Sequence, residues 1–266
     1  MRLASLLLAK TLWRHRNVLW ATTRLELQKK YAGSFLGYGW IVLHPLLFLA
    51  TYVVVFVLIF RVTLPGQSGL GYVLFLFCGL IPFLTFMEVA TSAAVAIRQN
   101  MHLLKNVIAP VEIIPARVVA LALVAQGVGL ALCLAFAAYE GSWSPRILAL
   151  PLLLTVAGVF YTGLAMTIAP IGMVFPDLAH GMGIAVNLLM FVSPIAFRRD
   201  MVPDLVKFLV DYNPVAYLFE GYRSVLLATH EPDWKALGIL VLIAIVTFEL
   251  GAQITMKFKS SVVDYE

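Results

Sequence analysis

Residues 21–60 read ATTRLELQKKYAGSFLGYGWIVLHPLLFLATYVVVFVLIF. This stretch begins with a polar and basic segment, passes through Gly33, Gly37 and Gly39, and then carries no charge over about twenty residues from Trp40. A helix of that length covers roughly 30 Å, which is the thickness of the hydrocarbon core of a bilayer. The sequence therefore predicts a basic segment outside the membrane, a turn at the glycines, and a first membrane-spanning helix.

The composition of the whole chain is typical of a membrane protein. Of its 266 residues, 62% are apolar and only 12% are charged, and the mean hydropathy is +0.94. Soluble proteins carry about twice this share of charged residues, so these few charges cannot cover a surface exposed to water. Lys and Arg do not cluster on a solvated domain, which argues against a nucleic-acid partner. Cys78 and Cys133 lie within apolar runs and are expected to be buried thiols rather than a disulfide.

We expect an all-α fold in which six helices span the membrane. The predicted spans are residues 38–60, 72–97, 113–138, 147–175, 181–197 and 237–256, of which the fifth is short. They belong to a single domain over residues 1–266, with a cytoplasmic and interfacial segment at 1–36, the bundle at 37–256 and a cytoplasmic tail at 257–266. Twelve Lys and Arg residues lie on the side of the two termini and seven on the other, so both termini are predicted to be cytoplasmic.

Residues 10–32 are predicted to form an amphipathic helix in the membrane interface. Trp13 and Trp20 can face lipid, while Arg14, Arg24 and Lys30 can meet phosphates or water. Two interpretations remain open for this helix. It is either an anchor that orients the chain, or a basic platform that also meets an anionic headgroup of the substrate.

Two further polar segments are expected on the cytoplasmic side. Residues 98–115 are too polar to span and suggest a short amphipathic helix ended by Pro110. This segment is either an ordinary connection or an element that docks on a cytosolic partner. In the turn at residues 175–178, Asp177 either caps the fifth span or touches a partner.

Residues 201–227 are too apolar for a simple external loop. Asn213 and Pro214 divide the segment, and the apolar residues that follow have helical spacing, with Glu220 and Arg223 on another face. We expect two short re-entrant helices on the outer side. Irregular backbone at that depth is tolerated only against protein or a water-filled cavity, so a crevice is expected there.

The sequence holds no motif for catalysis or for ATP binding. It contains no G-x-x-x-x-G-K-[ST], no H-E-x-x-H and no G-x-S-x-G, and its histidines and cysteines lack the spacing of a zinc site. We therefore expect no enzyme activity, no catalytic or metal-binding residue and no cofactor in this chain. Glu88 and Glu249 lie within spans without an evident intramembrane basic partner, and their roles stay open between a proton relay and a structural group.

Four stretches carry a resemblance to a known family. They are LELQKKYAGSFLGYGWIVLHPLLFLATYVVVFVLIF at 25–60, CGLIPFLTF at 78–86 with NMHLLKNVIAPVEIIPARV at 100–118, FPDLAHGMGIAVNLLMFVSPIAF at 175–197, and YNPVAYLFEGYRSVLL at 212–227. In this order, over nearly the whole chain, they resemble the permease subunits of ABC-2 type exporters for lipid-linked polysaccharides, namely O-antigen, teichoic acid and capsule. One departure is that no Lys or Arg follows Asp177 in Leu178-Ala179-His180.

The resemblance implies a homodimer of permeases in the bacterial inner membrane, bound to two separate ATPase subunits that hold ATP and Mg²⁺. It implies a lipid-linked glycan as substrate, with Arg24, Lys29 and Lys30 near the lipid pyrophosphate and Tyr31 and Tyr38 near the first sugars. Coupling to the ATPase would fall to Arg98, Asn100, Lys105, Asn106, Glu112 and Asp177. An outer gate would be formed by Asn213, Pro214, Tyr217, Glu220 and Arg223. Two alternatives remain: an ABC-2 permease for a small hydrophobic compound, and a channel or scaffold without an ATPase.

Overall fold

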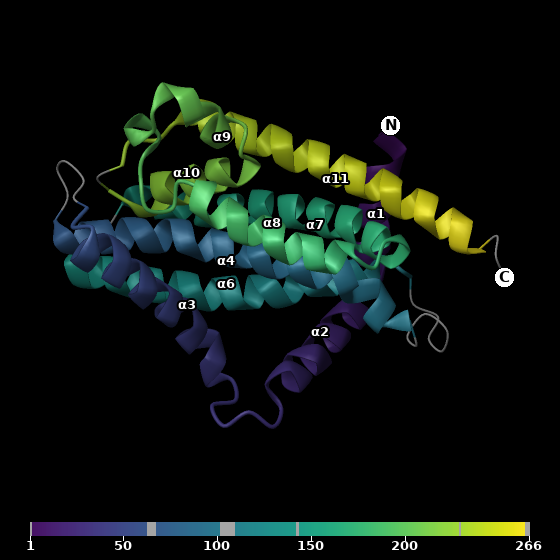
Figure 1. The fold of residues 1–266 in the computed structure, drawn as a ribbon. Helices are drawn as coiled ribbons and strands as arrows, with labels where there is room; N and C mark the ends of the chain where they lie inside the picture. The colour runs from purple at the N-terminus through teal and green to yellow at the C-terminus, as the bar shows by residue number, and fades with distance from the viewer. Residues whose placement is uncertain (1, 63–67, 102–109, 142–143, 229, 264–266) are drawn as a thin grey trace.

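The structure is a computed structural model that describes residues 2–62, 68–101, 110–141, 144–228 and 230–263 (Figure 1). Every regular element of these residues is a helix, as predicted. The helices in chain order are α1 (Arg2–Arg14), α2 (Arg16–Tyr31), α3 (Gly39–Tyr52) with its π-helical continuation Val53–Ile59, α4 (Gly69–Gln99), α6 (Ile113–Glu140), α7 (Leu150–Val174) preceded by a 3-10 turn Pro145–Ala149, α8 (Leu178–Val192), α9 (Lys207–Asp211), α10 (Pro214–Leu226) and α11 (Trp234–Val263).

Five helical stretches of the described chain are long and apolar enough to cross a membrane. They are Gly39–Ile59, Gly69–Gln99, Ile113–Glu140, Pro145–Val174 and Trp234–Lys259. They coincide with five of the six predicted spans. The remaining prediction, residues 181–197, falls on α8, which is apolar but has only 15 residues. The helix stops early because Ser193 precedes Pro194, and a residue before proline is driven into extended backbone.

Helix α4 is the centre of the bundle. In its most apolar window 78% of the residues are buried, against 6% for the span that contains α3. Helices α6, α7, α8 and α10 all pack on α4, while α3 lies at the periphery (Figure 1). The apolar surface of α3 therefore faces lipid or another chain rather than this core.

Helix α7 approaches both α4 and α11 at glycines. A Cβ atom at Gly172 would collide with the carbonyl group of Ala94 on α4, and one at Gly163 would collide with the backbone of Thr247 on α11. Gly251 on α11 lies equally close to the Gly163 carbonyl. Small residues of this kind let membrane helices touch backbone to backbone.

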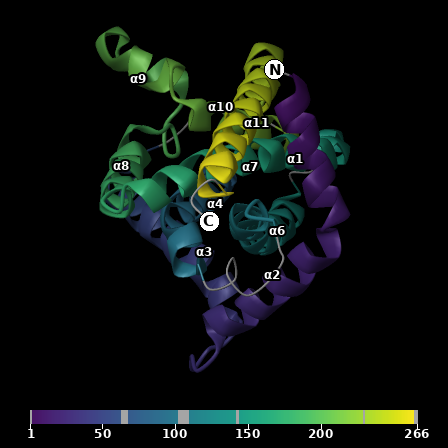
Figure 2. The same ribbon diagram turned by 90° about the vertical axis from the view of Figure 1, so that its right-hand side faces the viewer.

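Both termini lie at one end of the bundle, called here the terminal end, where α4 and α7 finish (Figure 1). The opposite, distal end carries α9 and α10. Seen from the terminal end, α1 and α2 run down one side of the bundle (Figure 2). Helix α1 packs on α11, and α2 crosses α6.

Candidate functional site

A cavity of about 420 Å³ opens between α2, α3, α4, α6 and α8, and we call it the lateral cavity. Its wall is mostly apolar, with Ile81 and Leu84 from α4, Leu121 and Ala125 from α6, and Val186 from α8. Its polar lining residues are Lys30, Tyr31, His44, Thr85, Glu88, Thr91, Gln126 and Asn187. The cavity is thus amphipathic, as a site for a lipid with a polar head would be.

Lys30 and Glu88, which both line the lateral cavity, form an ion pair. The Lys30 Nζ atom is 2.7 Å from Glu88 Oε1, and about two-fifths of each side chain is exposed. Ser92 donates a further hydrogen bond to Glu88 Oε1 at 3.3 Å. The sequence shows no intramembrane basic partner for Glu88, and the partner in the structure comes from a helix outside the spans, 58 residues earlier in the chain.

Gln126 forms part of the buried wall of the same cavity. Its Nε2 atom donates a hydrogen bond of 2.5 Å to the Tyr222 hydroxyl on α10. Its Oε1 atom is buried and has no hydrogen-bond partner among the described residues. A buried amide oxygen without a hydrogen-bond partner costs free energy in an apolar wall. It therefore marks a position where a ligand that donates a hydrogen bond can be recognised.

Of the five predicted headgroup residues, the structure brings Lys30 and Tyr31 together in the lateral cavity. Tyr38 packs against Tyr31, with 5.8 Å between the ring centroids. Burial raises the pKa of Tyr31, with a smaller lowering contribution from Lys30, so its hydroxyl is neutral and able to donate. Arg24 and Lys29 are exposed on α2 and do not line the cavity.

The predicted coupling residues gather at the terminal end but make contacts within the chain. Arg98 donates to the Pro176 carbonyl at 3.4 Å, next to the exposed Asp177. Asn100 accepts a hydrogen bond of 2.7 Å from Arg117. Glu112 is buried, and Lys259 donates to its Oε1 atom at 3.0 Å. The predicted positions Lys105 and Asn106 lie outside the described residues.

Asp177 stands at the N-cap position of α8, immediately before Leu178. Its side chain makes no capping hydrogen bond, so the capping interpretation was wrong. The side chain is exposed beside Phe175, whose ring is also exposed. The interpretation that Asp177 touches a partner stays a prediction.

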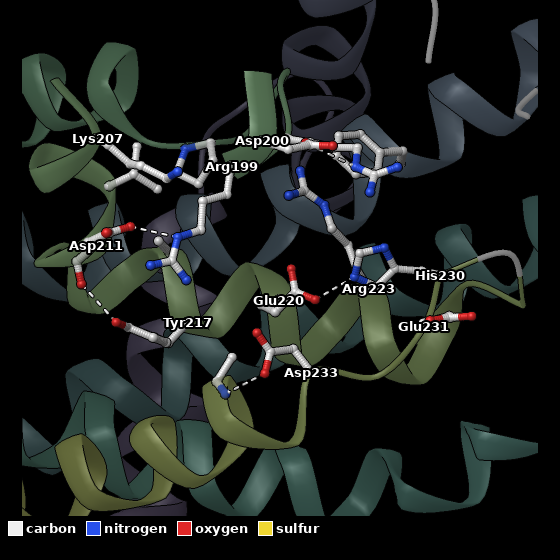
Figure 3. A pocket seen from close by; sticks show the side chains of 16 residues that line it. Arg199, Asp200, Lys207, Asp211, Tyr217, Glu220, Arg223, His230, Glu231 and Asp233 are labelled. Atoms are coloured by element: carbon white, nitrogen blue, oxygen red, sulfur yellow. Dashed lines mark hydrogen bonds and ion pairs between the residues drawn. The ribbon is translucent and has the colours of Figure 1, made fainter. Parts of the chain in front are cut away.

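A second cavity, of about 490 Å³, lies at the distal end and is called here the outer cavity (Figure 3). It is lined by the connection after α8, by α9 and α10, and by the start of α11. The predicted gate residues Tyr217, Glu220 and Arg223 line it. Asn213 and Pro214 instead begin α10, where Asn213 Oδ1 accepts the N–H of Val215 at 3.0 Å.

Arg223 is fully buried, which corrects the prediction that it lies on a face apart from the apolar residues of α10. Its guanidinium lies 3.6 Å from the ring centroid of Phe75 and donates to the Ile195 carbonyl at 2.7 Å. Gly79 makes room for it, since a Cβ there would lie 2.9 Å from Arg223 Nη2. Helical spacing could not reveal this, because the aromatic ring and the carbonyl come from distant segments.

Other charged residues of the outer cavity were missed by the sequence prediction. Arg199 pairs with Asp211 at 2.6 Å, and this hydrogen bond raises the pKa of Arg199 (Figure 3). Glu220 pairs with His230. The run of charges from Arg198 to Asp211 was a signal in the sequence, although it did not identify the partners.

Comparison with known proteins agrees with these features. Residues 17–227 match the family described as ABC-2 type transporter. The chain is 27% identical over 242 residues to the O-antigen export system permease protein RfbA of Myxococcus xanthus, covering 90% of this chain and 91% of that protein. It is 26% identical to RfbA of Klebsiella pneumoniae over 91% of this chain and 92% of that protein. It is 25% identical to the polysialic acid transport protein KpsM of Escherichia coli, covering 85% and 87% of the two chains. This chain therefore belongs to the ABC-2 type transporter family.

Proposed function

We propose that this chain is the permease subunit of an ATP-driven exporter that moves a lipid-linked polysaccharide across the bacterial cytoplasmic membrane. The observation that carries the proposal is the match over about nine-tenths of both chains to proteins named O-antigen export permeases. The amphipathic lateral cavity supports it, because a lipid-linked glycan needs a polar place for its headgroup and an apolar one for its tail. A small hydrophobic compound as substrate is favoured by none of the relatives reported above.

We further propose that α8 is a sixth, short span and that both termini are cytoplasmic. Five crossings would leave the termini on opposite sides, whereas Figure 1 has them at the same end. Helix α8 covers roughly 22 Å at 1.5 Å per residue, and the chain from Ser193 to Phe197 completes the crossing. Helices α9 and α10 are then the re-entrant pair on the outer side.

The partners in this proposal are a second copy of the chain and two ATPase subunits. The exposed apolar side chains of α3 and α8, among them Leu47, Val54, Leu188 and Phe191, support a surface that meets lipid or a second permease. The sequence carries no P-loop, so ATP and Mg²⁺ are assigned to the separate ATPase. Its docking place is the terminal end, around Arg98 and Asp177, and Lys105 and Asn106 stay predicted coupling residues.

Substrate handling is divided between the two cavities. Lys30 and Tyr31 meet the headgroup in the lateral cavity, while Arg24 and Lys29 attract it electrostatically and Tyr38 contacts the first sugars. The residues from Asn213 to Arg223 form the outer gate. All the work comes from ATP hydrolysis in the partner, so this chain supplies binding groups and moving helices rather than catalytic groups.

The test is copurification in mild detergent after expression with the ATPase encoded beside this chain. We expect a complex of two permeases and two ATPases that hydrolyses ATP. In cells that lack the chain, lipid-linked glycan should accumulate inside and be absent from the surface. A chain that purifies without any ATPase, in cells with normal surface glycan, would refute the proposal.

A further inference from the structure

Among the described residues that line the lateral cavity, Lys30 of α2 is the one lysine or arginine and Glu88 of α4 is the one carboxylate. The two side chains form an ion pair of 2.7 Å. Glu88 stands 19 residues into α4, or roughly 28 Å along the helix, close to the thickness of the hydrocarbon core. The pair therefore lies at the depth where the headgroup of a membrane lipid would lie.

This ion pair is weak enough to be exchanged. Both side chains are about two-fifths exposed, and exposed pairs contribute little to stability because water screens them. A diphosphate carries more charge and more acceptor oxygens than a carboxylate, so it binds an ammonium group more strongly. The hydroxyl of Tyr31, which lines the same cavity, offers a second donor to such a group.

The remaining wall fits the rest of such a ligand. Ile81, Leu84, Leu121, Ala125 and Val186 provide an apolar lining beyond the pair. Lys30 is therefore the cation that an anionic head would meet inside this cavity.

We propose that Glu88 is an internal competitor for the substrate headgroup: it binds Lys30 until the diphosphate of a polyprenyl lipid takes its place. The chemical identity of the lipid rests on the proposed function. The exchange also breaks the contact between α2 and α4, so that binding of the lipid releases α2 from the central helix. A carboxylate that competes with the ligand for Lys30 lowers the affinity of the chain for that ligand. The lower affinity lets the headgroup leave once transport is complete.

The test measures the binding of a polyprenyl diphosphate without sugars to the full chain, purified with its ATPase, in nanodiscs of zwitterionic lipid. Glu88→Gln should tighten binding about threefold to fivefold, because the competing charge is gone. Lys30→Ala should weaken binding about tenfold. In the double variant Glu88→Gln should give no gain, since there is no Lys30 to release.

The chain offers a matched control in another ion pair of α2. Glu26 is 3.6 Å from Arg117 on α6 and has a similar exposure, but neither residue lines the lateral cavity. Glu26→Gln should leave the affinity unchanged. Equal tightening by Glu26→Gln would mean that any loosening of α2 has this effect, and it would overturn the role of Glu88.

Other outcomes also decide the proposal. A gain from Glu88→Gln without Lys30 would reveal direct repulsion of the ligand instead of competition. A polyprenol that binds as tightly as the diphosphate would show that the phosphates are not recognised, and inorganic diphosphate that binds as tightly as the lipid would show that the tail is not. If these results appear while the wild-type complex hydrolyses ATP and exports glycan, only this inference fails.

Discussion

Gln126 on α6 donates its hydrogen bond of 2.5 Å to the hydroxyl of Tyr222 on α10, and both side chains are buried. Gln126 lines the lateral cavity, whereas the next residue in the chain after Tyr222 is Arg223, which lines the outer cavity. One side-chain contact therefore ties a residue that lines the lateral cavity to the helix that lines the outer cavity.

Removing this contact should destabilise the bundle. Tyr222→Phe removes the hydroxyl that accepts the hydrogen bond of Gln126 Nε2, which we expect to cost about 1 kcal/mol, a typical size for hydrogen bonds between membrane helices. The shift in the thermal unfolding midpoint in detergent measures this cost. Tyr217→Phe is the control on the same helix, because its hydroxyl binds the nearby Asp211 carbonyl and not another long helix. An equal shift for both variants would contradict the special role of Tyr222.

Arg223 should not tolerate replacement by lysine. Only a planar guanidinium can stack on Phe75 and reach the Ile195 carbonyl at the same time, so Arg223→Lys is expected to lose about 1–3 kcal/mol of stability. Arg198→Lys, at an exposed neighbour in the outer cavity, should change stability by less than about 0.5 kcal/mol. Thermal unfolding of the two purified variants measures the difference in stability. Equal losses of stability would contradict the buried stacking of Arg223 on Phe75.

Replacing Gly172 by alanine, which adds only one methyl group, should lower the stability of the protein. Gly172→Ala places a methyl group against the Ala94 carbonyl, and overpacking of this kind typically costs about 1–3 kcal/mol. Gly127→Ala on α6 is the matched control, since a Cβ there meets open space and alanine favours the helix. Yield and melting temperature of the purified chain report the difference. A stable Gly172→Ala variant would mean that α4 and α7 are not in backbone contact.

Lys259→Ala should leave the buried carboxylate of Glu112 without its charged partner. Because Lys259 is about half exposed, the expected loss is only about 1–2 kcal/mol. Glu112→Gln removes the charge that needs the lysine, so the double variant should be hardly less stable than Glu112→Gln alone. A double-mutant cycle on thermal stability measures this coupling, and strict additivity would show that the pair contributes nothing.

Replacing both Lys29 and Lys30 with alanine should reduce glycan export at least about tenfold while the complex with the ATPase still assembles. The reason is that these two lysines bring the largest local positive charge to the headgroup position. Surface glycan and copurified ATPase are measured in the same cells. Full export by the double variant would remove the headgroup role of this segment.

The long spans could be predicted because their apolar runs are long and uninterrupted, and the glycines after Tyr31 mark the turn before the first of them. The end of α8 was placed five residues too late, since Pro194 breaks the helix inside a run that stays apolar. Contacts between distant segments could not be predicted. The pairing of Lys30 with Glu88 and the burial of Arg223 depend on which faces of the helices meet, and a single sequence does not specify this.

The glycine contacts of α7 also limit how the protein can move. Backbones in direct contact cannot slide without collisions, so α4, α7 and α11 behave as one rigid lever from the terminal end to the distal end. A push from an ATPase at Pro176 would then be transmitted along this lever toward Arg223 and the outer cavity. The pieces left free to shift against this lever are α2, α3 and α8, each of which has at most two buried residues. We therefore expect movement within the protein to be concentrated at the lateral cavity, where these helices meet α4.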